Sequence, residues 1–250
     1  MLLIKKLYLD TDIIRINQEE LNLNNKIDRE LKSELSSKKE LFVQSILDWS
    51  QKQSQDFSWR KTDNPYHVLL AEIFLRKTKA DQVQKMYDSF LLAFPDLESI
   101  YNTSEAEIQK QIYSLGLGNI RSLWIKKICN DLYSKYGNNL SERNLESILG
   151  KEKKYLLNAL KCFVFGHKVA LFDVNIKRIL ERVFGINLGV NAHRKEISWN
   201  IAFILIPDKD WKQYNWGMLD LGRMICTASK PKCNICPLRQ LCKYSMEHSQ

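Results

Sequence analysis

The sequence predicts an all-α protein, and three observations lead to that prediction. Glycine and proline are scarce, with nine and five residues in a chain of 250, which argues against a loop-rich β-protein. Apolar residues recur at the three- and four-residue intervals of an amphipathic helix. No stretch of any length alternates apolar and polar residues in the way that marks a half-buried strand.

The expected helices follow one another along the chain with glycines between them. The first clear helical periodicity covers about 39–53, and the next helix begins at Pro65, for which Asn64 is a suitable N-cap. Residues 1–38 are polar and rich in asparagine, and we interpret them as a partly helical N-terminal extension. The remaining helices are expected at 82–93, 104–114, 119–136, 152–165, 174–184, 193–205 and 211–222.

The charge of the chain indicates a polyanionic partner. The net charge is +9, and residues 1–40 carry eight basic and eight acidic side chains, so the whole excess lies beyond them. A basic protein that is merely soluble is the alternative. No run of about 18 apolar residues is present, and the N-terminus lacks the apolar stretch of a signal peptide. We therefore expect no membrane partner, a cytoplasmic location with the nucleoid, and reduced cysteines.

Four cysteines near the C-terminus are the most informative feature of the chain. They have the spacing C-x6-C-x2-C-x5-C, and four thiolates so close in sequence can hold either a metal ion or an iron–sulfur cluster. Zinc sites more often pair two C-x2-C knuckles, and this loop has one, so we favour iron–sulfur over zinc and place disulfides third. Residues 223–243 carry five basic side chains and no acidic one, which suits a phosphate backbone, although the loop could simply staple the C-terminus. The four cysteines are Cys226, Cys233, Cys236 and Cys242.

Two acidic residues are candidates for chemistry. Glu72 shares a helix face with Val68, Leu69 and Leu75, so its carboxylate is expected among apolar side chains, where burial would raise its pKa towards a value useful for proton transfer. A position at the edge of the apolar face is the alternative. Asp173 precedes an amphipathic segment and is a natural N-cap. A helix N-terminus also favours an ionised carboxylate, which could stabilise a neighbouring cation.

With these residues, the chain resembles the helix-hairpin-helix base-excision DNA glycosylases of the endonuclease III and adenine-mismatch type, from about Trp59 to Tyr244. The matching segments are WRKTDNPYHVLLAEIFLRKTKA, LGLGNIRSLWIKKI, FDVNIKRILERVFG and MLDLGRMICTASKPKCNICPL. The resemblance implies a two-lobed HhH-GPD fold. A helical barrel lobe would cover 65–173, and a lobe of 39–64 and 174–250 would carry a [4Fe–4S] cluster on the four cysteines.

Within that superfamily the chain looks most like the thymine–DNA mismatch glycosylases, because KYL, CFVFG and DVN match their pattern without a gap. The resemblance implies catalytic roles for Asp173 and Glu72, with Tyr155 and Asn175 lining the pocket or holding Asp173. Counting back 18 residues from Asp173, to the place of the lyase lysine in bifunctional relatives, gives Tyr155. This favours a monofunctional enzyme.

The resemblance also implies which residues contact DNA. The family hairpin reads L-P-G-V-G, whereas this chain reads Leu149-Gly150-Lys151-Glu152-Lys153-Lys154, so phosphate binding would rest on lysine charge and the following helix N-terminus. Glu152 would oppose it. The residues expected to contact DNA, some by filling the gap left by an extruded base, are Arg76, Lys77, Gly116, Gly118, Asn119, Ile120, Arg121, Gly150, Lys153 and Lys154.

The implied function is a DNA N-glycosylase of base excision repair. It would act as a monomer on double-stranded DNA with a mismatched or damaged base, with thymine or uracil opposite guanine as the first choice. One alternative is an endonuclease III-like glycosylase and lyase for oxidised pyrimidines, with Lys154 as nucleophile. Adenine excision from mismatches with guanine is another. A DNA-binding module that has lost catalysis and a zinc-bound transcription factor are alternatives from other classes.

Overall fold

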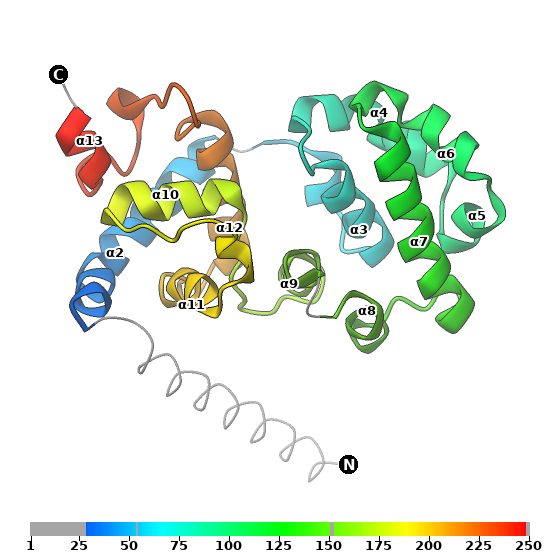
Figure 1. Ribbon diagram of the computed structural model, residues 1–250, viewed down its shortest axis with the longest axis horizontal. Coiled ribbons are helices and arrows are strands. Elements are labelled where there is room, and N and C mark those ends of the chain that lie inside the picture. Colours follow the sequence, from blue (N-terminus) through cyan, green and yellow to red (C-terminus); the bar gives the residue numbers. More distant parts are fainter. Residues whose placement is uncertain (1–28, 54, 151–152, 249–250) are drawn as a thin grey trace, which may run out of the picture. The chain divides into compact units, whose positions relative to one another are not determined.

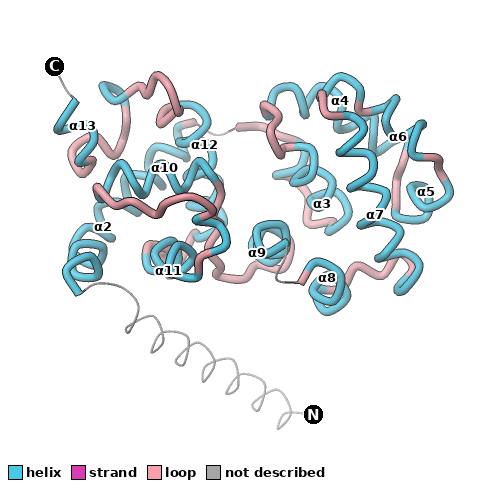
Figure 2. The backbone as a smooth tube through the Cα atoms, in the orientation of Figure 1, coloured by secondary structure: helices cyan, strands magenta, loops and turns pink. Residues whose placement is uncertain are grey.

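The computed structural model describes residues 29–53, 55–150 and 153–248 (Figure 1), so most of the expected N-terminal extension lies outside the described residues. Helices and loops make up this part of the chain, and it contains no strand (Figure 2). The prediction of an all-α protein is confirmed. Within the described ranges, no helix is long and apolar enough to cross a membrane.

The chain divides into two compact units. The first, which we call the terminal unit, is formed by Met1–Lys52 and Phe172–Gln250, and the second, the central unit, by Gln53–Leu171. The helices of the terminal unit are α2 (Arg29–Lys52), α10 (Val174–Phe184), η4 (Ala192–Arg194), α11 (Glu196–Ile204), α12 (Trp211–Met224), η5 (Cys233–Ile235) and α13 (Lys243–His248). Those of the central unit are η1 (Ser58–Arg60), α3 (Pro65–Phe74), α4 (Ala80–Ala93), α5 (Leu97–Asn102), α6 (Glu105–Gln111), η2 (Tyr113–Leu115), α7 (Gly118–Tyr136), α8 (Glu142–Leu149) and α9 (Lys154–Phe163).

In the terminal unit, α2 packs against α11 and α12, and α10 packs against α11, α12 and α13. The ring of Phe42 on α2 lies 5.7 Å from that of Phe184 on α10 and 6.5 Å from that of Tyr214 on α12. Helix α2 is already present at Arg29, the first residue described here and ten residues before the expected start, and its Leu35 is fully buried in this core. The boundary expected at residue 38 therefore falls inside a helix.

In the central unit, α7 contacts α3, α5, α6 and α8, and α3 also contacts α4 and α9. Residues 53–64, which we expected in the cluster lobe, belong to this unit. The reason is aromatic packing: Phe57 and Trp59 stack at 4.6 Å between ring centroids, and Trp59 meets Tyr87 of α4 edge-on at 5.3 Å. The expected N-cap of α3 is present, since Asn64 Oδ1 accepts from the backbone N–H of Tyr66 at 2.9 Å.

Candidate active site and cysteine loop

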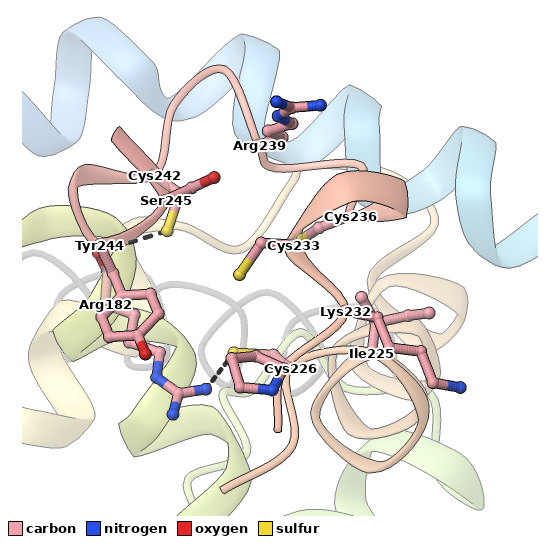
Figure 3. Close-up of a pocket in the computed structure, with 11 residues that line it drawn as sticks. Arg182, Ile225, Cys226, Lys232, Cys233, Cys236, Arg239, Cys242, Tyr244 and Ser245 are labelled. Carbon is pink, nitrogen blue, oxygen red and sulfur yellow. Dashed lines mark hydrogen bonds between the residues drawn. The ribbon is translucent and has the colours of Figure 1, made fainter. Parts of the chain in front are cut away.

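The four cysteines of the terminal unit surround one pocket (Figure 3). Cys226 follows the end of α12, Cys233 and Cys236 flank the single turn η5, and Cys242 immediately precedes α13. The backbone N–H of Cys226 donates to Leu221 O at 2.7 Å, so the last turn of α12 fixes the first sulfur atom. The loop thus brings all four cysteines to the same pocket.

The donor set fits an iron–sulfur cluster. Burial, with smaller contributions from the other three cysteines, raises the pKa of the Cys236 thiol to about 12, so four adjacent thiolates need a cationic centre to coexist. Among the described residues, no three His, Cys, Asp or Glu side chains converge closely enough for a single metal ion. A cluster differs from a zinc ion in binding each thiolate to a separate iron atom. The pocket therefore suits the larger group.

Arg182 of α10 is the basic side chain beside the first cysteine. Its guanidinium donates to Cys226 Sγ at 3.4 Å, to Thr227 O at 2.7 Å and to Ala228 O at 2.9 Å. The ring of Tyr244 covers this guanidinium at 4.7 Å, and Figure 3 shows the two side chains together at the edge of the pocket. A cation that donates to a thiolate stabilises the negative charge of a bound cluster.

Asp173 begins α10 at the other end of the same helix. Its Oδ1 accepts from the backbone N–H groups of Asn175 at 2.9 Å and Ile176 at 2.8 Å, and its Oδ2 accepts from Asn175 Nδ2 at 2.8 Å. Both carboxylate oxygens are therefore held in place, and the expected N-cap is present. Burial nevertheless raises the pKa of Asp173, although these hydrogen bonds and the charge of Arg178 oppose the rise.

The side chains of Asn175 and Arg178 connect Asp173 to the cysteine loop. Asn175 Oδ1 accepts from an Nη2 hydrogen of Arg178 at 2.9 Å, and the same nitrogen donates to Gly222 O at 2.7 Å. Arg178 Nε donates to Cys226 O at 2.7 Å. Asn175 thus holds Asp173, as expected, and a continuous chain of hydrogen bonds leads from it to the backbone of the first cysteine.

Glu72 and Tyr155 belong to the central unit. Glu72 is 5% exposed on α3, among buried apolar neighbours, as its position in the helical pattern predicted. Burial is the main cause of the raised pKa of Tyr87, and the negative charges of Asp88 and then Glu72 add to it. Tyr155 is half-buried in the first turn of α9 and lies close enough to Arg76 to influence its pKa. Their catalytic roles remain predictions.

Two exposed loops of the central unit, together with the first turn of α7, carry most of the residues expected to contact DNA. The first follows α3, and its residue Arg76 stacks over Trp124 at 4.3 Å. The second precedes α7 and includes Gly116, with φ 70°, and Gly118, the first residue of the helix. Beyond it, Asn119 and Ile120 are exposed, and Asn119 Oδ1 accepts from Gln109 Nε2.

Two residues of these loops have backbone conformations that L-amino acids rarely adopt. Lys77 has φ 56° and Leu117 has φ 53°, both in the left-handed region. The side chain of Leu117 is 53% exposed although it is apolar. The sequence analysis did not single out Leu117, and the signal was its place between Gly116 and Gly118, where glycines permit a sharp turn.

Arg121 occupies a place that the sequence did not predict. We expected it to contact DNA, but it is 5% exposed, and its guanidinium donates to oxygen atoms of the protein. In this structure the guanidinium is held by the protein, and its contact with DNA stays a prediction.

The hairpin between α8 and α9 is described in part. Gly150 ends α8 with φ 49°, a conformation that suits glycine, and Lys153 Nζ donates to Ile148 O at 3.4 Å. Lys151 and Glu152 lie outside the described residues. Lys154 is exposed and begins α9, whose first turn has no side-chain cap.

Comparison with known proteins matches both parts of this description. A family model described as "HhH-GPD superfamily base excision DNA repair protein" covers residues 70–198, and one described as "Iron-sulfur binding domain of endonuclease III" covers residues 226–242. The chain belongs to the HhH-GPD superfamily of base excision DNA repair proteins. It is a DNA glycosylase that binds DNA, and its cysteine loop holds a [4Fe–4S] cluster, as the sequence predicted.

Individual relatives agree with this assignment. The chain is 35% identical over 211 residues to a thymine/uracil-DNA glycosylase of Methanothermobacter thermautotrophicus, covering 84% of this chain and 95% of the relative. It is 30% identical to an adenine DNA glycosylase of Buchnera aphidicola over 81% of this chain and 58% of that relative. The solved structure of a thermostable thymine-DNA glycosylase superposes with a TM-score of 0.75 at 32% identity, over 84% of this chain and 98% of the other.

Proposed function

We propose that this protein excises thymine or uracil opposite guanine from double-stranded DNA, by hydrolysis of the N-glycosidic bond and without cleaving the strand. The names of the relatives that it matches over nearly their whole length support this choice of base. The chain covers 95% of the thymine/uracil-specific relative but 58% of the adenine-specific one, which is a longer protein. We expect the enzyme to act as a monomer.

The observation that carries the proposed chemistry is the immobilised carboxylate of Asp173. Cleavage of an N-glycosidic bond develops positive charge on the sugar, as in other glycoside hydrolyses. A carboxylate whose two oxygen atoms are already held by hydrogen bonds needs no reorganisation to stabilise that charge. Ionised Asp173 would also orient the attacking water.

Glu72 is the candidate to assist departure of the base. Its carboxyl group is buried in α3, and in its protonated form it would donate to the leaving base. Tyr155, in the first turn of α9, would line the pocket that receives the extruded nucleotide. The cluster supplies cross-links that hold the cysteine loop in its fold, and the cationic surface of that loop would contact phosphate.

The two exposed loops would supply the wedge that replaces the extruded base. A target atom hidden in the duplex has to be flipped out of the stack, and the gap has to be filled. Leu117 is an exposed apolar side chain at the tip of one loop, and Lys77 is its basic counterpart on the other. Arg76, Asn119 and Ile120 would contact the neighbouring bases. The uncapped first turn of α9, beside Gly150, Lys153 and Lys154, would bind a phosphate.

The register at the start of α9 supports the proposal that the strand is not cleaved. A lyase needs an amine that attacks the sugar, and the corresponding place holds Tyr155. Lys154 lies one position earlier, about 100° around the helix. We therefore assign Lys154 to phosphate binding.

The experiment is incubation with duplexes that contain thymine or uracil opposite guanine, adenine opposite guanine, or an oxidised pyrimidine, with and without alkali before electrophoresis. We expect cleavage of the duplexes with thymine or uracil opposite guanine, after alkali only, and no adduct after borohydride. Lys154→Ala should retain base release, and Asp173→Asn should serve as the inactive control. A borohydride-trapped adduct that disappears in Lys154→Ala would establish the bifunctional alternative, and release of adenine alone would establish the adenine-specific one.

A further inference from the structure

The buried guanidinium of Arg121 joins the two exposed loops of the central unit. Its Nη2 donates to Arg76 O and to Thr78 Oγ1, each at 2.7 Å, which holds the loop after α3. Its Nη1 donates to Gly116 O at 2.8 Å and to Leu115 O at 3.3 Å, which holds the loop before α7. One side chain therefore binds two segments that are about forty residues apart in sequence.

The two loops also contact each other and Arg121 through other bonds. Thr78 Oγ1 lies 3.5 Å from Leu115 O, within donating distance. The backbone N–H of Arg121 donates to Leu117 O at 3.0 Å, so Arg121 holds the second loop by its main chain as well as its side chain. Each loop contains one residue in the left-handed region, Lys77 and Leu117. Such conformations persist only where the surroundings hold them.

The burial of Arg121 is unusual because all four of its side-chain acceptors are neutral oxygen atoms. A buried cation without a carboxylate partner is unfavourable, and burial accordingly lowers the pKa of Arg121. A well-packed apolar residue would stabilise a helix start at least as well. Neither an apolar residue nor a lysine has the five donors of a planar guanidinium, which can reach both loops at once. The geometry of these hydrogen bonds therefore indicates that Arg121 joins the two loops rather than stabilising the fold in general.

We propose that Arg121 is a positioning residue that makes the two loops one rigid, two-pronged wedge, with Lys77 on one prong and Leu117 on the other. This proposal rests on the base extrusion of the proposed function. A wedge held rigid before binding loses little freedom on entering DNA, so it lowers the free energy of the extruded state. Removing the guanidinium frees both prongs together.

The first test needs no DNA. Hydrogen exchange of the free protein should show faster exchange in both loops, residues 75–79 and 115–118, in Arg121→Gln. The matched control is Lys127→Gln, which removes an exposed charge from the same helix and should leave both loops unchanged. Faster exchange in the second loop only would show that Arg121 does not join the prongs and would overturn the proposal. This result is independent of which base the enzyme excises.

The second test compares two duplexes in single-turnover assays, using whichever target base the wild-type enzyme releases. In one duplex the target is paired opposite guanine, and in the other it lies opposite an abasic position, where extrusion needs less assistance. We expect Arg121→Gln and Arg121→Lys to be slower by roughly tenfold or more on the paired target and nearly normal on the other. An equal loss on both duplexes would assign Arg121 a purely structural role.

Thr78→Val keeps the proposal testable if the Arg121 variants do not fold. It retains the shape of the side chain and removes one acceptor of the guanidinium, and we expect a smaller loss in the same direction, confined to the paired target. Failure of the wild type on thymine and uracil would overturn the proposed specificity alone. Identical Thr78→Val and wild-type rates on the paired target would count against the wedge.

Discussion

The guanidinium of Arg178 donates from Nε to the backbone carbonyl of Cys226 at 2.7 Å. Through Asn175 the same guanidinium reaches the carboxylate of Asp173. The first ligand of the cluster and the carboxylate proposed to stabilise the transition state are therefore parts of one hydrogen-bonded network within the terminal unit.

Loss of the Arg178 fork should reduce catalysis by disordering Asn175. We expect Arg178→Lys, which keeps the charge but cannot donate to three acceptors in the same geometry, to lower the single-turnover rate by on the order of tenfold. Iron content should remain near that of the wild type, because Arg178 contacts the carbonyl of Cys226 and not its sulfur atom. Iron loss in proportion to activity would contradict this, since the defect would then lie in cluster binding.

Replacement of Gly222 should displace Asn175. A Cβ atom at position 222 would lie 2.5 Å from Asn175 Cβ and 3.4 Å from its Cα, so a stiff part of the chain would have to move. We expect Gly222→Ala to lose most activity and to cost about 1–3 kcal/mol of stability through overpacking. Measured rates should be corrected for the folded fraction.

Gly217→Ala is the matched control for that variant. It lies on the same helix, and its added Cβ would meet Ile46 and Ser50 at 2.8 and 2.9 Å, on the side of α2. A similar loss of stability with nearly normal activity per folded molecule is expected. Equal inactivation by both substitutions would show that packing of α12 in general, rather than contact with Asn175, determines the rate.

The raised pKa of Asp173 predicts a pH-dependent effect of its removal. Because burial raises this pKa, the folded protein binds the proton more tightly than the unfolded chain does. The contribution of this carboxyl to stability is therefore present at low pH and is lost as the pH rises through its folded-state pKa. The Tm of Asp173→Asn relative to the wild type should increase as the pH rises from about 4 to about 8. A difference that decreases over this range would indicate a lowered pKa.

The same ionisation should govern activity. Stabilisation of positive charge on the sugar needs the carboxylate, so the wild-type rate should fall as the pH falls through the raised pKa of Asp173. Asp173→Asn should bind substrate DNA and be slower by on the order of a hundredfold at neutral pH. Near-wild-type turnover of this variant would reduce Asp173 to a helix cap.

The cluster should depend on Arg182 for its resistance to oxidation. Anaerobically purified protein should be yellow-brown and contain about four irons per chain. In Arg182→Gln the charge that faces Cys226 Sγ is lost, and we expect visible absorbance to bleach several-fold faster in air, with a lower reduction potential. Arg239→Gln removes an equal charge from an exposed side chain that points away from the sulfur atoms (Figure 3), and it should bleach at the wild-type rate.

Much of this protein was predictable from local sequence. Helical periodicity, the Asn64 and Asp173 caps and the spacing of the four cysteines all depend on residues within one or two turns of each other. Glu72 was predicted to be buried for the same reason, because its helix neighbours are apolar. The resemblance of several segments to one family then supplied the enzyme class.

Tertiary structure determined the contacts between segments that are far apart in the sequence. Helix α2 includes residues before the expected start at 39, and among them Leu35 is buried in a core built partly from the other end of the chain. Arg121 and Arg178 look like surface cations in the sequence, yet one is buried and both are held by backbone carbonyls of residues up to 48 positions away. Carbonyl acceptors are the same at every residue, so no side-chain pattern marks them. Only the folded chain determines which of them meet a guanidinium.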